Sequence, residues 1–255
     1  MNHQKFSPYN FITQNSGISY LVMGGVLLAG FFIAQFGSVV AAGILHGFNF
    51  SDVFSILSPP FTDASYRNTL LIAQGVNSAI LFIVTPLFYL YFYERVRPQR
   101  VFSTEDRLNW QIVILTVVLV IVYMPISAYS AFWNESIQIP GSFGDFARAM
   151  EDQLKELTLF MVSFDSLPQF LLGLFIIAVI PGIGEELLFR GILQNKIEKA
   201  SGNMHLAIWS TALIFSAFHL QFYGFIPRML LGGLFGYLYV WSGTLLVPIF
   251  SAFCK

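Results

Sequence analysis

The segment GISYLVMGGVLLAGFFIAQFGSVVAAGI, residues 17–44, contains no charged residue. A membrane-spanning helix needs about 20 consecutive, mostly apolar residues, and this run exceeds that length. It is also longer than the apolar core of a signal peptide, and Lys5 is the one charged residue before it. We therefore expect an uncleaved membrane helix at the start of the chain.

The composition of the whole chain agrees with that first run. Of 255 residues, 56% are hydrophobic and 11% are charged, against about 25% charged in a soluble domain. So apolar a chain is not disordered. With 13 Lys and Arg against 14 Asp and Glu, it does not favour a nucleic-acid partner. Its one cysteine, Cys254, excludes an intramolecular disulfide framework. The fold class predicted is all-α, a polytopic transmembrane helical bundle.

About seven hydrophobic spans can be traced along the chain. They are residues 17–44, about 69–93, about 110–133, one that starts near 170, about 205–222, about 226–241, and one from about 244 that stops at the chain end. The seventh run has about half the length needed to cross a bilayer, which favours a truncated C-terminus.

We expect one integrated membrane domain with two parts. Residues 1–166 hold the N-terminal spans and a long polar loop, and residues 167–255 hold the core helices. Within the loop, residues 147–162 place apolar side chains at helical spacing, namely Met150, Leu154, Leu157, Phe160 and Met161. This pattern predicts an amphipathic helix on the membrane surface, with a solvated linker helix as the alternative.

The basic residues of the short loops predict the orientation. Several fall on one side of the membrane if the N-terminus is cytoplasmic: Lys5, Arg95, Arg97, Arg100, Arg107, Lys196 and Lys199. We therefore expect an integral protein of a bacterial cytoplasmic membrane with its N-terminus inside.

Three charged residues interrupt the fourth span, in the stretch IPGIGEELLFRG of residues 180–191. A carboxylate at membrane depth costs about 2.5–3.5 kcal/mol on insertion scales, so intramembrane ionisable groups indicate a functional site. Glu186 and Arg190 lie four residues apart on one helix face and can pair. Glu185 points about 100° away from Glu186, so it can face a cavity near the cytoplasmic end of the span.

His219 is the polar residue of the next span. Consecutive spans joined by a modest loop are antiparallel neighbours, so His219 and Glu185 can hold one water between them. Both residues fall late in their spans, however, and they meet only if the span boundaries differ from those drawn here. The alternative is a neutralising Glu186–Arg190 pair and an interfacial histidine, with no site.

The motifs Glu185-Glu186-x-x-x-Arg190 and Phe215-x-x-x-His219 together resemble the first two signatures of the CAAX-processing and bacteriocin-processing (CPBP, or Abi) family of intramembrane proteases. That family includes Ras-converting-enzyme-type CAAX prenyl proteases and bacterial relatives linked to bacteriocin immunity. The resemblance covers about residues 167–255. It implies that Glu185 is the general base that activates water, that His219 helps to hold this water, and that Glu186 and Arg190 support the site.

The resemblance leaves the question of a metal open. The family has been called metalloprotease-like, and a divalent ion such as zinc would use Glu185 and His219. A zinc site normally has three protein ligands, and Glu186 is the third candidate. Adjacent residues of one helix do not easily face one ion, so we expect water activation without a protein-bound metal and commit to no cofactor.

One position departs from the family pattern. The third family motif is a histidine followed four residues later by an asparagine, and these groups are thought to stabilise the oxyanion. Ala252 stands where that histidine is expected. Alanine has no side-chain donor, and the loss of one oxyanion donor typically costs 10²–10³ in rate. We therefore expect either that the chain is truncated or altered at its C-terminus or that it is a degenerate relative with little proteolytic activity.

The resulting prediction is an intramembrane endopeptidase that acts on a membrane-associated peptide or protein, with membrane lipid as its surroundings and no nucleic-acid partner. The first alternative is a catalytically impaired relative that binds a partner, for instance in immunity. The second is a proton-coupled transporter, since buried Glu, Arg and His also suit proton relays.

Overall fold

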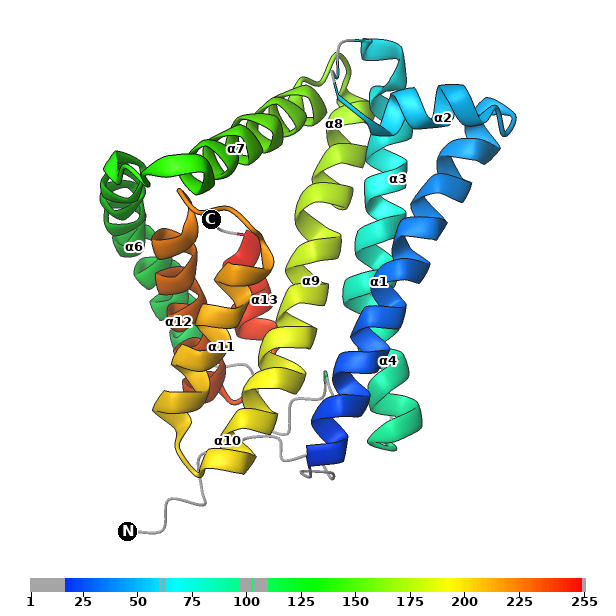
Figure 1. Ribbon diagram of the computed structural model, residues 1–255. Coiled ribbons are helices and arrows are strands. Elements are labelled where there is room, and N and C mark those ends of the chain that lie inside the picture. Colours follow the sequence, from blue (N-terminus) through cyan, green and yellow to red (C-terminus); the bar gives the residue numbers. More distant parts are fainter. Residues whose placement is uncertain (1–16, 60, 62, 97–101, 103–109, 254–255) are drawn as a thin grey trace.

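The regular structure of the protein is helical. The computed structural model describes residues 17–59, 61, 63–96, 102 and 110–253, and within these ranges it contains no strand. Most helices run along the length of one bundle, and one helix, α7, crosses its end (Figure 1). The predicted all-α helical membrane bundle is confirmed.

Four helical segments are long and apolar enough to cross a membrane. The first is α1 (Gly17–His46) and the third is α6 (Trp110–Ser136). The second is continuous over 64–93: η2 (Ala64–Tyr66), α3 (Arg67–Ala79), η3 (Ile80–Val84), α4 (Thr85–Phe88) and η4 (Tyr89–Tyr93). The fourth is continuous over 167–201: α8 (Leu167–Leu174), η5 (Phe175–Val179), α9 (Ile180–Glu186), η6 (Leu187–Gln194) and α10 (Asn195–Ser201).

The fifth, sixth and seventh expected spans are shorter helices. They are α11 (Met204–Phe218), α12 (Phe225–Ser242) and α13 (Leu246–Phe253). α12 packs between α11 and α6, and α13 packs against α9 and α6. Gly232 allows the close approach of α11, because a Cβ there would lie 3.2 Å from the Cα of Ala212.

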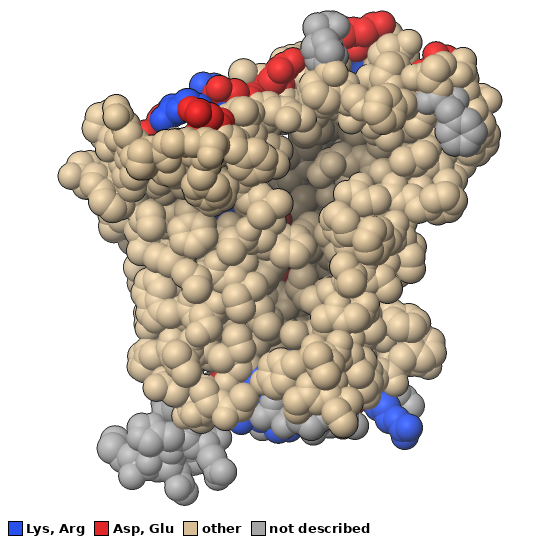
Figure 2. Space-filling model, viewed as in Figure 1, with Lys and Arg blue, Asp and Glu red and all other residues tan. Residues whose placement is uncertain are grey.

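The predicted helix in the long loop is α7 (Gly141–Val162), and a further short helix, α2 (Phe50–Leu57), follows α1. The apolar residues of α7 that were expected on one face are partly or fully buried, and Met161 is the most buried of them. Charged side chains cover the outer side of α7, and the body of the molecule below it presents few charges (Figure 2). At its C-terminal end, Arg67 pairs with Asp165 and donates from Nε to the carbonyl of Phe160 over 2.9 Å.

A buried network ties α10 to the start of the chain. The Lys196 ammonium lies 3.0 Å from a carboxylate oxygen of Glu94, and both side chains are 0% exposed. Tyr89 donates to the same carboxylate over 2.8 Å, and Lys196 also donates to the hydroxyl of Ser19. Tyr20 donates from its hydroxyl to the Lys196 carbonyl over 2.9 Å.

This network corrects one assignment in the orientation prediction. Lys196 was counted as a basic loop residue, but the helix continues to Ser201 and buries its ammonium. Lys199 and Arg95 are exposed as expected. Lys5, Arg97, Arg100 and Arg107 lie outside the described residues, so the orientation remains a prediction.

Candidate active site

Glu185 lies near the middle of the 167–201 helix. We expected it near the cytoplasmic end of its span, and that expectation is wrong because the helix continues through Asn195 and Lys196 to Ser201. A π-helical stretch, η5, directly precedes Pro181 and accommodates the residue that lacks an N–H. The helix therefore passes through the Pro-Gly stretch without a break.

Gly184 brings the preceding span close to the carboxylates. A Cβ at this position would lie 2.5 Å from the Cβ of Phe82 and 2.8 Å from its carbonyl oxygen. Only a glycine permits that approach, so η3 packs directly against the turn that carries Glu185.

Glu186 and Arg190 form the expected pair at i and i+4. Arg190 Nη1 donates to Glu186 Oε1 over 2.7 Å, and the two side chains are 1% and 2% exposed. Arg190 Nη2 donates to the carbonyl of Gly232 over 3.0 Å, and the guanidinium lies over the rings of Phe215 and Phe235. This arrangement joins η6 to α12 and holds the helix face from which Glu185 projects.

The structure brings Glu185 and His219 together. Glu185 Oε1 lies 3.8 Å from His219 Nε2, and their side chains are 15% and 28% exposed. They meet because α11 returns antiparallel from the turn at Gly202 and ends at Phe218, with His219 as its C-cap. The stretch from Glu185 to the turn and the stretch from the turn to His219 have similar lengths, so the two residues reach the same depth.

The backbone of α11 fixes the tautomer of His219. Its Nδ1 lies 2.9 Å from the carbonyl oxygen of Phe215. A carbonyl oxygen only accepts hydrogen bonds, so Nδ1 carries a proton and, in the neutral ring, Nε2 carries the lone pair. That lone pair is on the nitrogen nearer Glu185, which is the arrangement required of a group that holds or accepts a water proton.

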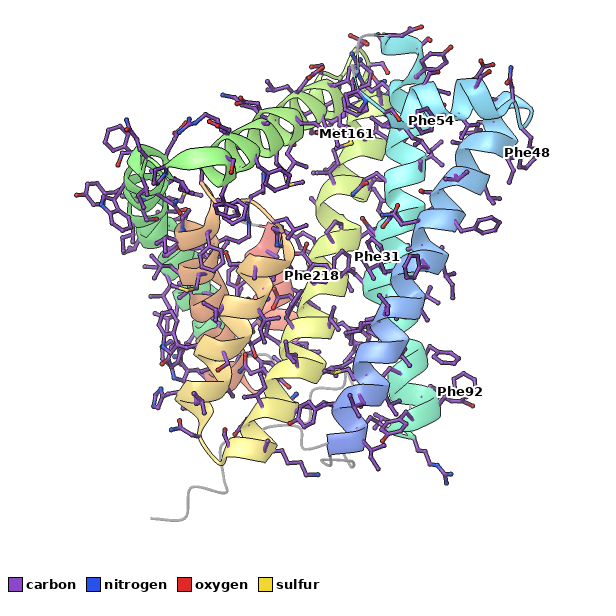
Figure 3. All side chains as sticks on the ribbon, viewed as in Figure 1. Phe31, Phe48, Phe54, Phe92, Met161 and Phe218 are labelled. Atoms are coloured by element: carbon purple, nitrogen blue, oxygen red, sulfur yellow. The ribbon has the colours of Figure 1, made fainter. Side chains whose placement is uncertain are left out.

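Aromatic rings enclose the pair within the bundle. Phe218 packs against Phe82 of η3 and Phe189 of η6, with ring centroids 5.9 and 6.1 Å apart. Figure 3 shows Phe218 between α11 and the 167–201 helix. A hollow opens beneath α7, and acidic surface is visible inside it (Figure 2). We call this hollow the recess, and Glu185 and His219 are themselves partly exposed.

Two charged residues near this site were not predicted as part of it. Arg228, in the first turn of α12, interacts electrostatically with Glu151 of α7 and with Glu185. Arg228 lies in the span expected at about 226–241 and Glu151 in the helix expected at 147–162, and neither had been assigned to the site. The short connection between α11 and α12 carried the missed signal, because it returns the chain to the neighbourhood of His219 within a few residues.

Ala252 does not supply the hydrogen-bond donor expected from a histidine at this position. It packs beside the apolar cluster of Phe235, Leu238 and Val247. Its neighbour Ser251 is buried and donates to the carbonyl of Val247 over 2.8 Å, so that hydroxyl is used within α13. Phe253 contacts the position of Gly182, one turn before the two carboxylates.

The donor set at this site does not fit a protein-bound zinc ion. Glu186 accepts from Arg190, which leaves Glu185 and His219 of the three candidates considered. Among the described residues no group of three His, Cys, Asp or Glu side chains could hold a metal ion. Three protein ligands are the usual minimum for a zinc site.

A cavity of about 450 Å³ lies beyond the site, between α1, α3 and α7. Its polar lining includes Gln35, Gln74 and Asn77, and Asn77 donates to Gln35 over 2.9 Å. Neither Glu185 nor His219 lines it. This cavity is therefore separate from the candidate chemistry.

Comparison with known proteins agrees with the motifs. Residues 167–254 match the family model described as "Type II CAAX prenyl endopeptidase Rce1-like". This segment is similar to that family. The predicted resemblance is thus confirmed for the part of the chain that holds Glu185, Glu186, Arg190 and His219.

One curated relative and the solved structures complete the comparison. A 73-residue stretch is 36% identical to "Uncharacterized protein YpbD" of Bacillus subtilis (strain 168), over 27% of this chain and 34% of that protein. The match thus spans about a third of the relative's length. No solved structure matches the chain significantly.

Proposed function

We propose that this protein is an intramembrane endopeptidase that uses Glu185 to activate water. The observation that carries the proposal is the Glu185–His219 pair, 3.8 Å apart and partly exposed within an apolar bundle. This separation exceeds a direct hydrogen bond, so a water about 2.8 Å from each group would sit beside the pair and bind both. The Rce1-like match of residues 167–254 supports this class of activity.

The reaction follows from the two groups. Glu185 takes a proton from the water while Nε2 of His219 holds it by accepting its second hydrogen. The resulting hydroxide attacks the carbonyl carbon of a peptide bond and forms a tetrahedral oxyanion. The protonated Glu185 then gives its proton to the leaving nitrogen, the C–N bond breaks, and the carboxylate is restored.

We propose as substrate a peptide or membrane protein segment that reaches the recess from the lipid or from the α7 side of the bundle. The protein would lie in a bacterial cytoplasmic membrane with its N-terminus inside. The exposed Lys199 and Arg95 lie at the end of the bundle opposite α7. The recess would then open away from the cytoplasm. No residue of the site argues for a prenyl group on the substrate.

The alternative supported by a specific residue is a non-catalytic membrane protein that binds a peptide partner. Ala252 supplies no donor for the oxyanion at the position where one was expected. Such a protein would retain the recess and the Glu186–Arg190 pair without turnover.

Cleavage that depends on Glu185 separates these functions. Membranes of cells that express the wild-type protein, Glu185→Gln or Glu135→Gln are compared by quantitative profiling of new protein N-termini. Glu135 is an exposed carboxylate at the end of α6 and serves as the matched control. We expect new N-termini with the wild type and Glu135→Gln, and a fall of about 10²–10⁴-fold with Glu185→Gln.

Two results would contradict the proposal. One is a set of new N-termini that Glu185→Gln leaves unchanged. The other is a wild-type profile identical to that of cells without the protein, which would favour the binding protein.

A further inference from the structure

The proposed reaction needs a donor that the expected position does not supply. The tetrahedral intermediate carries a negative oxygen, and preorganised donors aimed at that oxygen are usually a large part of catalysis. Ala252 has no such donor and packs into an apolar cluster. The inference below rests on the proposed function and asks which described residue takes this role.

Arg228 is held in the connection that also positions His219. His219 caps α11, and Arg228 follows in the first turn of α12, where its N–H donates to the carbonyl of Gly224 over 3.2 Å. Its guanidinium packs on Gly224, since a Cβ there would lie 2.9 Å from Nη2. Asn134 of α6 fixes this connection by donating to the carbonyl of Phe222 and accepting from the N–H of Ile226.

The guanidinium of Arg228 has one engaged and one unengaged end. Nη2 donates to Oε1 of Gln221. Nη1 is buried and has no hydrogen-bond partner in the described part of the chain. A buried donor left without an acceptor costs free energy, so Nη1 is a group prepared to bind an oxygen atom.

Arg190, the other guanidinium of this region, cannot serve in the same way. Both of its terminal nitrogens are engaged, by Glu186 and by the Gly232 carbonyl. Its Nε is buried without a partner among the described residues, but the side chain is only 1% exposed. The rings of Phe215 and Phe235 also enclose it. Arg228, by contrast, lies within electrostatic range of Glu185 and of Glu151 of α7.

We propose that Nη1 of Arg228 donates to the oxyanion of the tetrahedral intermediate, in place of a donor from α13. Arg228 remains protonated throughout and transfers no proton. Glu151 balances its charge from α7, and Gln221 fixes the orientation of the guanidinium plane. The chain thereby places general base, water-holding imidazole and oxyanion donor on α9, α11 and α12.

The test measures steady-state cleavage of a transmembrane peptide that carries a site mapped by the N-terminal profiling. Arg228→Met should lower kcat by about 10²–10³-fold with little change in KM, because the interaction forms only in the transition state. Arg228→Lys should retain part of kcat, since it keeps the charge without the fork of donors. Added guanidinium should restore part of the activity of Arg228→Ala, which a purely structural role would not allow.

Arg148→Met is the matched control. Arg148 is another cation, on α7, with its guanidinium 4.5 Å from the centroid of the Tyr223 ring. Its removal should leave kcat unchanged. If Arg228→Met fails to fold, Arg228→Lys and the guanidinium rescue of Arg228→Ala decide.

The outcomes separate this inference from the function on which it rests. Glu185-dependent cleavage with an unchanged kcat in Arg228→Met, or a loss that guanidinium does not restore, overturns the role of Arg228 alone. Wild-type protein with no Glu185-dependent cleavage overturns both. A loss of kcat that guanidinium restores supports the inference.

Discussion

Two of the charged clusters in the described part of the bundle differ in how completely the protein surrounds them. Lys196 and Glu94 are fully enclosed, and hydroxyl groups of Ser19 and Tyr89 complete their hydrogen bonds. Glu185 and His219 are partly exposed, and they lie too far apart for a direct hydrogen bond. The enclosed cluster has the geometry of a structural ion pair that joins helices, and the open cluster has that of a site with room for another molecule.

The enclosed cluster should govern stability. Lys196→Met leaves the Glu94 carboxylate buried without its cation, which typically costs about 3–5 kcal/mol. Thermal unfolding in detergent should show this as a large fall in Tm. Glu185→Gln should lower the free energy of unfolding by less than about 1 kcal/mol, and so change Tm only slightly, because its carboxylate is partly hydrated.

The matched controls define what would break this contrast. Lys199→Met removes an exposed cation three residues further along α10 and should leave Tm unchanged. The double variant Glu94→Leu with Lys196→Met should recover most of the loss, since apolar replacements of a buried pair are often neutral. A Tm that falls equally for Glu185→Gln and Lys196→Met would show that both clusters are structural.

A smaller effect is expected where η3 contacts the open cluster. Gly184→Ala places a methyl group 2.5–2.8 Å from the backbone and Cβ of Phe82, and overpacking of this kind costs about 1–3 kcal/mol. The shift of α9 should also lower cleavage, because Glu185 is the next residue. Unfolding and cleavage of the same sample give both values.

The control for that substitution is Gly25→Ala in α1. No atom lies within 4 Å of a Cβ at Gly25, so alanine should stabilise the helix by about 0.5–1 kcal/mol. If Gly184→Ala also stabilised the protein and kept full cleavage, the close contact with Phe82 would not constrain the site.

The smallest effect is expected outside the bundle, at Asp63. Its carboxylate is hydrogen-bonded by the side chain of Ser65 and by the N–H of Ser65, the latter over 2.9 Å at the start of η2, and these hydrogen bonds hold its pKa below the ordinary value of 3.8. A lowered pKa in the folded state means that the stabilisation is present above pH about 4 and is lost as the pH falls through the folded-state pKa. Asp63→Asn should therefore have a slightly lower Tm than the wild type at pH 7, and this difference in Tm should be smaller at pH 3. A difference between the two proteins that is independent of pH would contradict this.

The sequence predicted what depends on spacing within one helix. The Glu186–Arg190 pair and the inner face of α7 both follow from the helical period, and both are present. The depth of Glu185 relative to His219 was not predictable in the same way. Polar residues such as Asn195 were interpreted as the start of a loop, whereas Asn195 donates to the carbonyl of Gly191 and to the hydroxyl of Tyr239 inside the bundle.

Contacts between distant segments account for the rest. Glu94 and Lys196 are far apart in the chain, and neither residue signals the other. Arg228 fell within the expected sixth span, and its proximity to the charges of Glu151 and Glu185 was not predictable because these residues come from two other helices. A single sequence gives no warrant for such pairs, since local periodicity ends at the boundaries of each helix.

The hairpin formed by α9 to α11 sets the depth of Glu185 relative to His219. The turn at Gly202, which adopts a positive φ of 64°, fixes where the return begins. Each residue inserted into either arm would raise or lower its side chain by about 1.5 Å and rotate it by about 100°. The number of residues between Glu185 and His219 is therefore a functional dimension of the molecule, although most of those residues never touch the recess.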